Sequence, residues 1–396
     1  MKIILDYDTI QSIINLCSLK SNICNLDFAK NCDGCGESLS IRFSASIGSV
    51  WLDLNFFLYT HNSHLDISEA GELTTTWLPL LRILKIAKRG ESLTIISNED
   101  GKTLAFSVGR MRFKLNQVTR EFSESIGNLV RLKPDIKRTV VKLQDFLQNL
   151  EAVKCSVASD KADKDLFQGS PVLMEFMESS STLRLVTTDF KGLAYCDMPM
   201  QLDGKPPFEI QIDISCLDAL VSIKLDKKSV DLDLEISVKD NLSLVFSVPA
   251  LNFNLTIPSM RRTFPDYKSI LVDEFSYSLG LVFGDLWDCV ASLCAVESPN
   301  KILLKFKDGQ LFLKAVNKSH MQAEGDIFFT SCMVDEVEDI TLAIHPTLFI
   351  QPLRFLKTVS TADTKIHLNF NSAREAIFIH ANSFEHAKYV VMPLIA

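Results

Sequence analysis

The sequence predicts an α+β protein of three repeated domains, each with two helices backed by antiparallel sheets. Residues 104–108 and 113–115 recur as residues 244–248 and 253–255, with each residue 140 positions before its counterpart. Within each third of the chain, a strand, an amphipathic helix and further alternating strands follow one another twice. A repeat of this length is a whole domain rather than a solenoid unit of about 20 to 50 residues.

Length and composition agree with this partition. The 396 residues, 47% apolar and 23% charged, suit a soluble globular protein of two to four domains. Polar or proline-bearing stretches around residues 130–137 and 258–265 predict domains at 1–132, 133–262 and 263–396. We expect no signal peptide or membrane span, since acid follows early and no apolar run nears ~18 residues. Ten irregularly spaced cysteines indicate reduced thiols and a cytoplasmic protein.

The second half of each domain carries the clearest pattern. The first domain has strand 72–75, helix 77–89 and strands 92–96 and 104–115. The second has strand 208–212, helix 216–225 and strands 230–238 and 242–257. The third has strand 340–344, a helix ending near Lys357 and strands 365–370, 376–380 and 389–392. Ser215 with Asp218 predicts a capping box, and Pro346 fits a first helical turn. Pro352 predicts a kink or a later helix start.

The first half of each domain repeats the theme with one strand and one helix. Strand 3–5 leads into helix 9–19, strand 139–141 into helix 145–155, and strand 277–282 into helix 285–296. Each domain therefore presents two helices on one side of its strands.

Positive charge recurs on these helices although the net charge is −8. On helix 77–89, Arg82, Lys85 and Arg89 share a face at i, i+3 and i+7, with Lys88 beside them. The matching helices offer Lys224, Lys227 and Lys228, and Arg354 and Lys357, while the first helices add Lys20 and Lys154. Cations also favour helix C-termini through the macrodipole. Recurrence at the same element of all three repeats favours a shared surface for a polyanion.

The strands show the opposite sign. In residues 230–236, apolar residues alternate with Asp231, Asp233 and Glu235, which predicts one buried face and one solvated acidic face. A metal site would need carboxylates that converge from different elements. Duplex DNA, with one negative charge per about 1.7 Å of axis, would lie against the helices and be repelled by such sheets.

The sequence contains no complete catalytic motif of the kinds considered below. Gly101-Lys102-Thr103 resembles the end of a phosphate loop, but the first glycine would fall at Ile96. Nucleophile-elbow, zincin and dinucleotide-binding motifs are missing, so we expect no enzyme and no cofactor. Cys32 and Cys35, with Cys17 and Cys24, raise a zinc hypothesis, but a second C-x-x-C is missing and buried thiols in a turn are the alternative.

Three further motifs carry a family resemblance. Residues 183–189 (LRLVTTD) with Leu193-Ala194 and Met198-Pro199, residues 264–267 (FPDY) and residues 389–394 (YVVMPL) resemble the bacterial DNA polymerase III beta subunit, the sliding clamp. The motifs stand in the family's order and spacing, and the threefold repeat covers the whole chain. Divergence is greatest between about residues 22 and 72, as in a distant or phage-encoded member.

The resemblance implies a head-to-tail homodimer whose six domains form a ring, with helices around a hole and sheets outside. Pairing of open sheet edges between two chains would remove both edges. Double-stranded DNA would pass through without base readout, because backbone contacts carry no sequence information. Such a ring tethers the replicative polymerase for processivity and is no enzyme. The alternative is a clamp-fold interaction scaffold that does not encircle DNA.

The family also binds short linear peptides of DNA polymerase, the clamp loader and other replication or repair proteins. The resemblance places this pocket, between the second and third domains, at Val172, Leu173, Thr188, Phe190, Leu193, Pro265, Ile270, Val390, Val391, Met392, Pro393 and Leu394. The family usually reads Asp-Gly-His-Arg-Leu where this chain reads residues 189–193 as DFKGL, and Ser269 replaces a usual basic residue. These departures predict an altered pocket shape and peptide preference.

Overall fold

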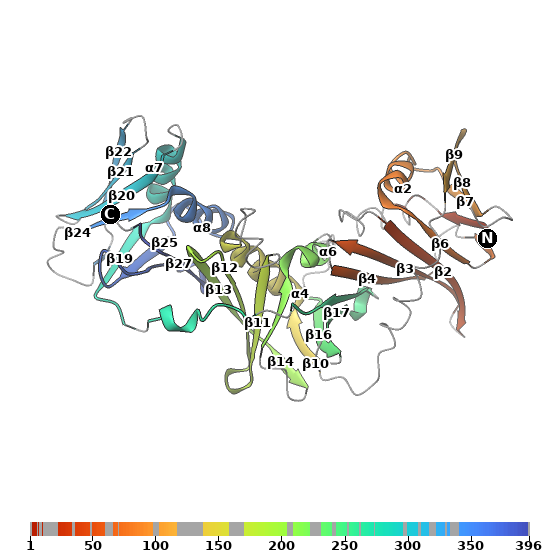
Figure 1. Cartoon of the computed structure of the whole chain (residues 1–396), viewed down its shortest axis with the longest axis horizontal. Coiled ribbons are helices and arrows are strands. Elements are labelled where there is room, and N and C mark those ends of the chain that lie inside the picture. The colour runs from red at the N-terminus through yellow and green to blue at the C-terminus, as the bar shows by residue number, and fades with distance from the viewer. Residues whose placement is uncertain are drawn as a thin grey trace. The chain divides into compact units, whose positions relative to one another are not determined.

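The computed structural model describes part of the 396-residue chain. The described residues are 2–5, 7, 10, 23–33, 36–47, 50–59, 66–69, 71–97, 103–116, 138–157, 170–203, 209–221, 231–239, 243–251, 253–260, 263–272, 274–295, 299–307, 310–316, 322–328, 331–332 and 340–394. Contacts divide the chain into unit 1 (1–147, 200–207 and 212–259) and unit 2 (148–199, 208–211 and 260–396) (Figure 1). No helix among these residues is long and apolar enough to cross a membrane.

Unit 1 holds two antiparallel sheets. The five-stranded sheet runs β5 (Asp66–Glu69), β1 (Lys2–Leu5), β7 (Leu93–Ser97), β8 (Thr103–Val108) and β9 (Met111–Asn116). The nine-stranded sheet runs β14 (Gln201–Asp203), β10 (Arg138–Lys142), β16 (Asp233–Lys239), β17 (Ser243–Val248), β18 (Phe253–Pro258), β4 (Val50–Tyr59), β3 (Gly36–Ile47), β2 (Ile23–Asp33) and β6 (Gly71–Thr76).

The nine-stranded sheet of unit 1 joins segments far apart in the sequence. β18 pairs with β4, with Leu255 opposite Leu54, and Figure 1 shows the red β2–β4 beside the green β16 and β17. This pairing crosses the predicted boundary at residue 132. The three-domain partition therefore stays a prediction, because the contacts group the strands by continuous sheet rather than by repeat.

Helix α2 (Trp77–Leu84) ends earlier than predicted. The amide of Lys85 still bonds to Leu81 O (3.0 Å), but those of Ile86 and Ala87 bond only three residues back. This tightening ends the helix, and the chain leaves it through Gly90 at φ +88°. Lys88 and Arg89 therefore lie in a turn, so the predicted helical face does not extend to them.

The acidic strand also differs from the prediction. On β16 and the residues before it, Asp231, Asp233 and Glu235 point outward as predicted. However, cations of the neighbouring strand β10 form ion pairs with these carboxylates. Lys142 Nζ lies 2.7 Å from Asp231 and 2.9 Å from Asp233, and Arg138 lies 3.1 Å from Glu235. Hydrogen bonds to Asp231 and Asp233 raise the pKa of Lys142. This sheet face is thus a mixed-charge surface, with cations from a strand about 90 residues earlier.

The predicted capping box at Ser215 is also wrong. Ser215 lies inside a short 3₁₀ helix, η5 (Ile214–Leu217), that leads into α6 (Asp218–Val221). Its amide and hydroxyl both donate to Asp213 Oδ1, at 2.9 Å and 2.6 Å. Asp213 therefore caps this helix, because its carboxylate satisfies the amide two residues on.

Unit 2 holds the other two antiparallel sheets. The nine-stranded sheet runs β15 (Glu209–Asp213), β11 (Pro171–Met177), β12 (Thr182–Thr188), β13 (Gly192–Pro199), β27 (Phe384–Val391), β26 (Ile377–Ala381), β25 (Lys365–Phe370), β19 (Tyr277–Val282) and β23 (Ser331–Cys332). The four-stranded sheet runs β22 (Gln322–Phe328), β21 (Gln310–Val316), β20 (Lys301–Lys307) and β24 (Ile340–Ile344).

The described helices of unit 2 lie close to their predicted places. α7 (Phe283–Ala295) buries Leu286, Val290 and Leu293 and contacts β22 and β21. α8 (Pro346–Val359) begins at Pro346, as predicted, and continues through Pro352, which is buried. α4 (Leu143–Val153), whose residues from 148 on belong to unit 2, is followed by the 3₁₀ helix η3 (Lys154–Ser156). These antiparallel sheets and helices confirm the predicted α+β class, whereas most of helix 9–19 lies outside the described residues.

Candidate functional site

The turn between β12 and β13 is fixed by its own side chains. Thr188 Oγ1 donates to Gly192 O (2.7 Å) and accepts from the amide of Phe190 (3.1 Å). Asp189 Oδ1 accepts from the amides of Lys191 (3.0 Å) and Gly192 (2.7 Å). Such side-chain bonds to the backbone replace those that a regular turn would make. They hold Phe190 in the left-handed region at φ +68°.

The C-terminal tail runs beside this turn. β27 pairs with β13, and beyond it the amide of Met392 donates to Lys191 O (3.0 Å). The amide of Leu394 then donates to Ala343 O (2.7 Å) at the end of β24. Backbone bonds therefore fix residues 392–394 between the turn and the four-stranded sheet.

The turn and tail expose large apolar side chains, together with the cation Lys191. Phe190 is 51% exposed, and Met392 and Leu394 are each 37% exposed, while Pro393 is half-buried. We call these four residues the rim. Large apolar side chains that gather on a surface mark a docking site more often than isolated ones do.

An aromatic-rich apolar cluster underlies this region of unit 2. Its buried members are Leu173, Val186, Leu193, Tyr195, Tyr267, Phe378 and Val390, with Phe264, Ile270, Leu271, Phe275 and Ala376 partly buried against them. Phe275 and Phe378 meet edge-to-face with centroids 4.9 Å apart, a favourable arrangement for aromatic rings. The cluster brings together the predicted Leu173, Leu193, Ile270 and Val390.

A polar network anchors the segment of residues 263–272 to this cluster. The Tyr267 hydroxyl donates to Glu175 Oε2, and Lys268 Nζ lies 2.6 Å from Glu175 Oε1. Arg184, which also bonds Tyr267, makes two bonds of 2.6 and 2.8 Å to Asp197. Burial and the bond to Glu175 raise the pKa of Tyr267. Because Glu175 is only 4% exposed, its charge needs these partners.

A cavity of about 450 Å³ opens beside the network. Its lining is Leu173, Glu175, Glu209, Gln211, Thr263, Phe264, Pro265, Asp266, Tyr267 and Lys268. The predicted Leu173 and Pro265 lie in this wall. Thr188 and Leu193 are buried below the rim, at 6% and 2% exposure.

Two predicted pocket residues lie on the other side of the sheet. Side chains alternate along a strand, so Val172 faces away from Leu173, and Val391 faces away from Val390. Both valines are buried. Of the proposed pair Val172 or Leu173, only Leu173 therefore shares a face with the apolar cluster.

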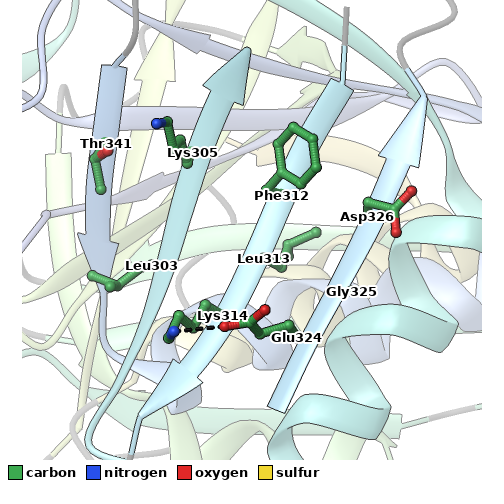
Figure 2. Close-up of a pocket in the computed structure, with 9 residues that line it drawn as sticks. All are labelled: Leu303, Lys305, Phe312, Leu313, Lys314, Glu324, Gly325, Asp326 and Thr341. Atoms are coloured by element: carbon green, nitrogen blue, oxygen red, sulfur yellow. Dashed lines mark hydrogen bonds and ion pairs between the residues drawn. The ribbon is translucent and has the colours of Figure 1, made fainter. Parts of the chain in front are cut away.

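A larger cavity, of about 610 Å³, lies on the outer face of the four-stranded sheet. Figure 2 shows its side chains, with Lys305, Phe312 and Asp326 in one row across β20, β21 and β22 and Lys314 paired with Glu324 at 2.5 Å. No residue of the predicted sites lines it. Part of its wall is the edge strand β22, which contributes the carboxylates of Glu324 and Asp326.

The predicted phosphate-binding cations divide into two groups. Arg82 on α2 and Lys85, Lys88 and Arg89 after it are exposed, as are Arg354 and Lys357 on α8. Lys357 Nζ stands 4.3 Å over the ring of Trp287. Lys154, in contrast, pairs with Glu151 at 2.6 Å. Lys20, Lys224, Lys227 and Lys228 lie outside the described residues.

The first helices differ from the second ones. α4 exposes Asp145 and Glu151, and α7 exposes Asp285 and Asp288. Free positive charge in the described helices is therefore concentrated at α2 and α8.

The four cysteines of the zinc hypothesis lie in the N-terminal part of the chain. Cys17 and Cys35 lie outside the described residues, and only the backbone of Cys24 and Cys32 on β2 is described. Within the described part of the chain, no group of three or more His, Cys, Asp or Glu is placed to hold a metal ion.

Known proteins resemble this chain both in sequence and in structure. No family model matches the chain. A Haemophilus influenzae protein named beta sliding clamp is 23% identical over 344 residues, which are 84% of this chain and 85% of that protein. The solved DNA polymerase III beta subunit of Pseudomonas aeruginosa superposes over 100% of both chains with a TM-score of 0.79 at 17% identity. The sliding clamp of Bacillus subtilis covers 100% of this chain and 99% of its own, with a TM-score of 0.78 at 14% identity.

The chain has the sliding-clamp fold. Full-length superposition at such low identity confirms the family resemblance read from residues 183–189, 264–267 and 389–394 and marks the chain as divergent. Within the sliding-clamp fold, these three motifs come together in one region of unit 2: the turn, the anchored segment and the tail.

The network residues Glu175 and Lys268 are not part of the sites predicted from the sequence. Glu175 is the one acid in a strand of apolar residues (PVLMEFM), a signal of a buried and therefore paired charge. Its partners Tyr267 and Lys268 are 92 or more residues away in sequence, so no local pattern could have named them.

Proposed function

We propose that this chain is a DNA sliding clamp that encircles duplex DNA and tethers the replicative polymerase, without catalysing a reaction. The observation that carries the proposal is the sliding-clamp fold over the full chain, together with sequence similarity to a protein named beta sliding clamp over 84% of it. Such a protein works where DNA is replicated, so we place it in the cytoplasm.

The sheets support a homodimer. Each nine-stranded sheet joins five strands of one predicted domain to four strands of the domain before it, across the predicted boundaries. One five-stranded sheet in unit 1 and one four-stranded sheet in unit 2 are left over. A second copy, arranged head-to-tail, would join five to four again and remove both open edges. Two chains would then form a closed ring of six domains.

The repeat indicates which edges meet. β9 is the counterpart of β18 in the 140-residue repeat, and β18 is the strand that pairs with β4. β22 occupies in its sheet the place that β4 occupies in the other. We therefore propose that β9 of one copy pairs with β22 of the other. Arg112 and Lys114 on β9 are exposed, as are Glu324 and Asp326 on β22, so the edges are complementary in charge.

The cations supply the DNA contact. Arg82, Lys85, Arg354 and Lys357 would face phosphates, and Lys224, Lys227 and Lys228 would add to them. Contacts to phosphate are independent of sequence and weaken with salt, which allows a ring to slide. Topology, rather than affinity, would keep the ring on the DNA.

Partner proteins would dock on unit 2. The rim and the apolar cluster below it offer anchor positions for a short linear peptide of a polymerase, clamp loader or repair protein. The network of Glu175, Tyr267 and Lys268 would hold the wall that contains Pro265 and Ile270.

A topology experiment tests this function against the scaffold alternative. The chain is loaded on a nicked circular plasmid with its cognate loader and ATP, and retention is measured in high salt before and after linearisation. A clamp stays on the circle and leaves the linear form. Retention that does not depend on DNA topology would favour the clamp-fold scaffold.

A further inference from the structure

Unit 2 contains two sets of four strands that are arranged in the same order. The first set is β15, β11, β12 and β13 in the nine-stranded sheet, and the second set is β24, β20, β21 and β22 in the smaller sheet. In both sets the last strand in sequence lies beside the first, and a helix follows it: η5 follows β15, and α8 follows β24. The outer faces of the two sets can therefore be compared strand by strand.

The outer face of the first set is covered by another part of the chain. Leu173 on β11 and Val186 on β12 are 2% and 0% exposed, and residues of the segment 263–272 pack against the cluster that contains them. Glu175, on the same face of β11, holds this segment through an ion pair with Lys268. An acid of the sheet thus binds a cation of the segment that covers it.

The outer face of the second set is open. Phe312 is in the middle of β21, where it alternates with the buried Leu311 and Leu313, and its side chain is 39% exposed. Phe328, on β22, is 67% exposed. The cavity of about 610 Å³ lies beside Phe312, and Figure 2 shows Lys305 and Thr341 around it. Exposed aromatic rings next to a cavity of this size indicate a surface that receives a ligand.

Positive charge predominates on this open face. Along β20, lysines alternate with residues that are buried on the other side of the sheet. The lysines that β20 and β21 place on the face are Lys301, Lys305, Lys307 and Lys314. β22 adds two carboxylates, of which Glu324 pairs with Lys314 and Asp326 lies beside Phe312. The described residues of β20, β21 and β22 therefore give this face more cations than anions, and an acidic ligand complements it.

We propose that the outer face of the four-stranded sheet binds an extended acidic segment of a partner protein, with an apolar side chain of that segment on Phe312. The segment would take the place on the second set that residues 263–272 take on the first. No rim residue lines the cavity, so the proposal does not rest on the peptide docking proposed above. Pairing of β9 with β22 would leave the face open, because the hydrogen bonds of a sheet lie in its plane.

Peptide selection tests this surface. Random short peptides displayed on phage are selected on the Met392→Glu chain, in which a charge on the rim disfavours apolar peptides there. Selection should return acidic peptides that contain an apolar residue. Phe312→Ser should weaken their binding by about tenfold or more, because the ring is the anchor position. Lys305→Glu with Lys307→Glu should weaken it similarly, through repulsion of the acidic residues.

Ile96→Ser is the matched control, since Ile96 is also on a strand and is 40% exposed. Loss of binding in the Phe312 and lysine variants, with Ile96→Ser like the parent chain, supports the proposal. It is overturned if no acidic peptide is selected, if Phe312→Ser binds like the parent chain, or if Ile96→Ser loses binding equally. Loss in Phe312→Ser alone overturns the acidic chemistry of the segment. The plasmid-retention experiment does not involve this face, so either proposal can fail without the other.

Discussion

Units 1 and 2 each hold a nine-stranded sheet and one smaller sheet, but the smaller sheets end in edge strands of opposite charge. Unit 1 ends its five-stranded sheet in β9, with exposed Arg112 and Lys114, whereas unit 2 ends its four-stranded sheet in β22, with exposed Glu324 and Asp326. If the two edge strands carried the same charge, charge would not distinguish pairing of β9 with β22 from pairing of two identical strands. Unequal edges favour head-to-tail pairing of two copies, because like-charged edges repel each other.

The largest expected effect comes from removing this difference. Glu324→Lys with Asp326→Lys should raise the dissociation constant of the dimer by about 100-fold or more, because four cations then meet at each joint. Sedimentation equilibrium measures the change. Adding Arg112→Glu and Lys114→Glu should restore the dimer. Glu375→Lys with Glu385→Lys, which adds the same charge elsewhere on unit 2, is the matched control, and equal weakening by the control would refute pairing through β22.

A second difference is the polar network of unit 2. Tyr267→Phe removes one partner of the buried Glu175 carboxylate and should cost about 1 to 3 kcal/mol of unfolding free energy. Hydrogen exchange should locate the loss in β11, β12 and β13 and leave the sheets of unit 1 unchanged. Tyr277→Phe, on β19, is the control. A uniform loss in both units would mean that the network does not act locally.

The proposed DNA contact can be tested in each unit separately. Arg354→Glu with Lys357→Glu on α8 should reduce the slope of log affinity against log salt by about 2, since two phosphate contacts are lost. Arg82→Glu with Lys85→Glu should reduce it similarly in unit 1. Lys388→Glu with Lys365→Glu, on strands of unit 2, should leave the slope unchanged. An unchanged slope in both helix variants would mean that these cations do not face DNA.

The smallest effect is a pH dependence confined to unit 2. His380 stacks on His367 at 4.8 Å, and burial, helped by His367 and Lys388, lowers the pKa of His380 to about 4. The unfolded chain then binds a proton between about pH 6.5 and 4 that the folded chain does not, so stability is lost as pH falls through this window. His380→Gln should flatten that loss in denaturant titrations. Equal pH dependence in the variant would assign the loss to other groups.

Much of the fold could be predicted from local pattern. Strand 340–344, strand 365–370 and strand 277–282 match β24, β25 and β19, because alternation and flanking turns report a strand that is half buried. The end of α2 could not, since only a shift of hydrogen bonds to three residues back ends it. The pairing of Lys142 with Asp231 could not either, because it depends on strands that meet only in the fold.

The candidate site could be predicted only in part, because local sequence pattern gives its region but not its contacts. The motifs around Thr188, Pro265 and Val390 named its region, but the orientation of each side chain followed from strand register. Register placed Leu173 and Val390 on the cluster face and Val172 and Val391 on the other. The strained φ of Phe190 has no sequence signal apart from the departure from the family pattern.

An image of the purified chain at low resolution, with its mass in solution, tests the central claim most directly. Two copies of the 44.4 kDa chain should form one closed ring, with each joint made by β9 of one copy and β22 of the other. A single chain at all concentrations, or copies joined through other strands without a central hole, would contradict the proposal that this protein encircles DNA.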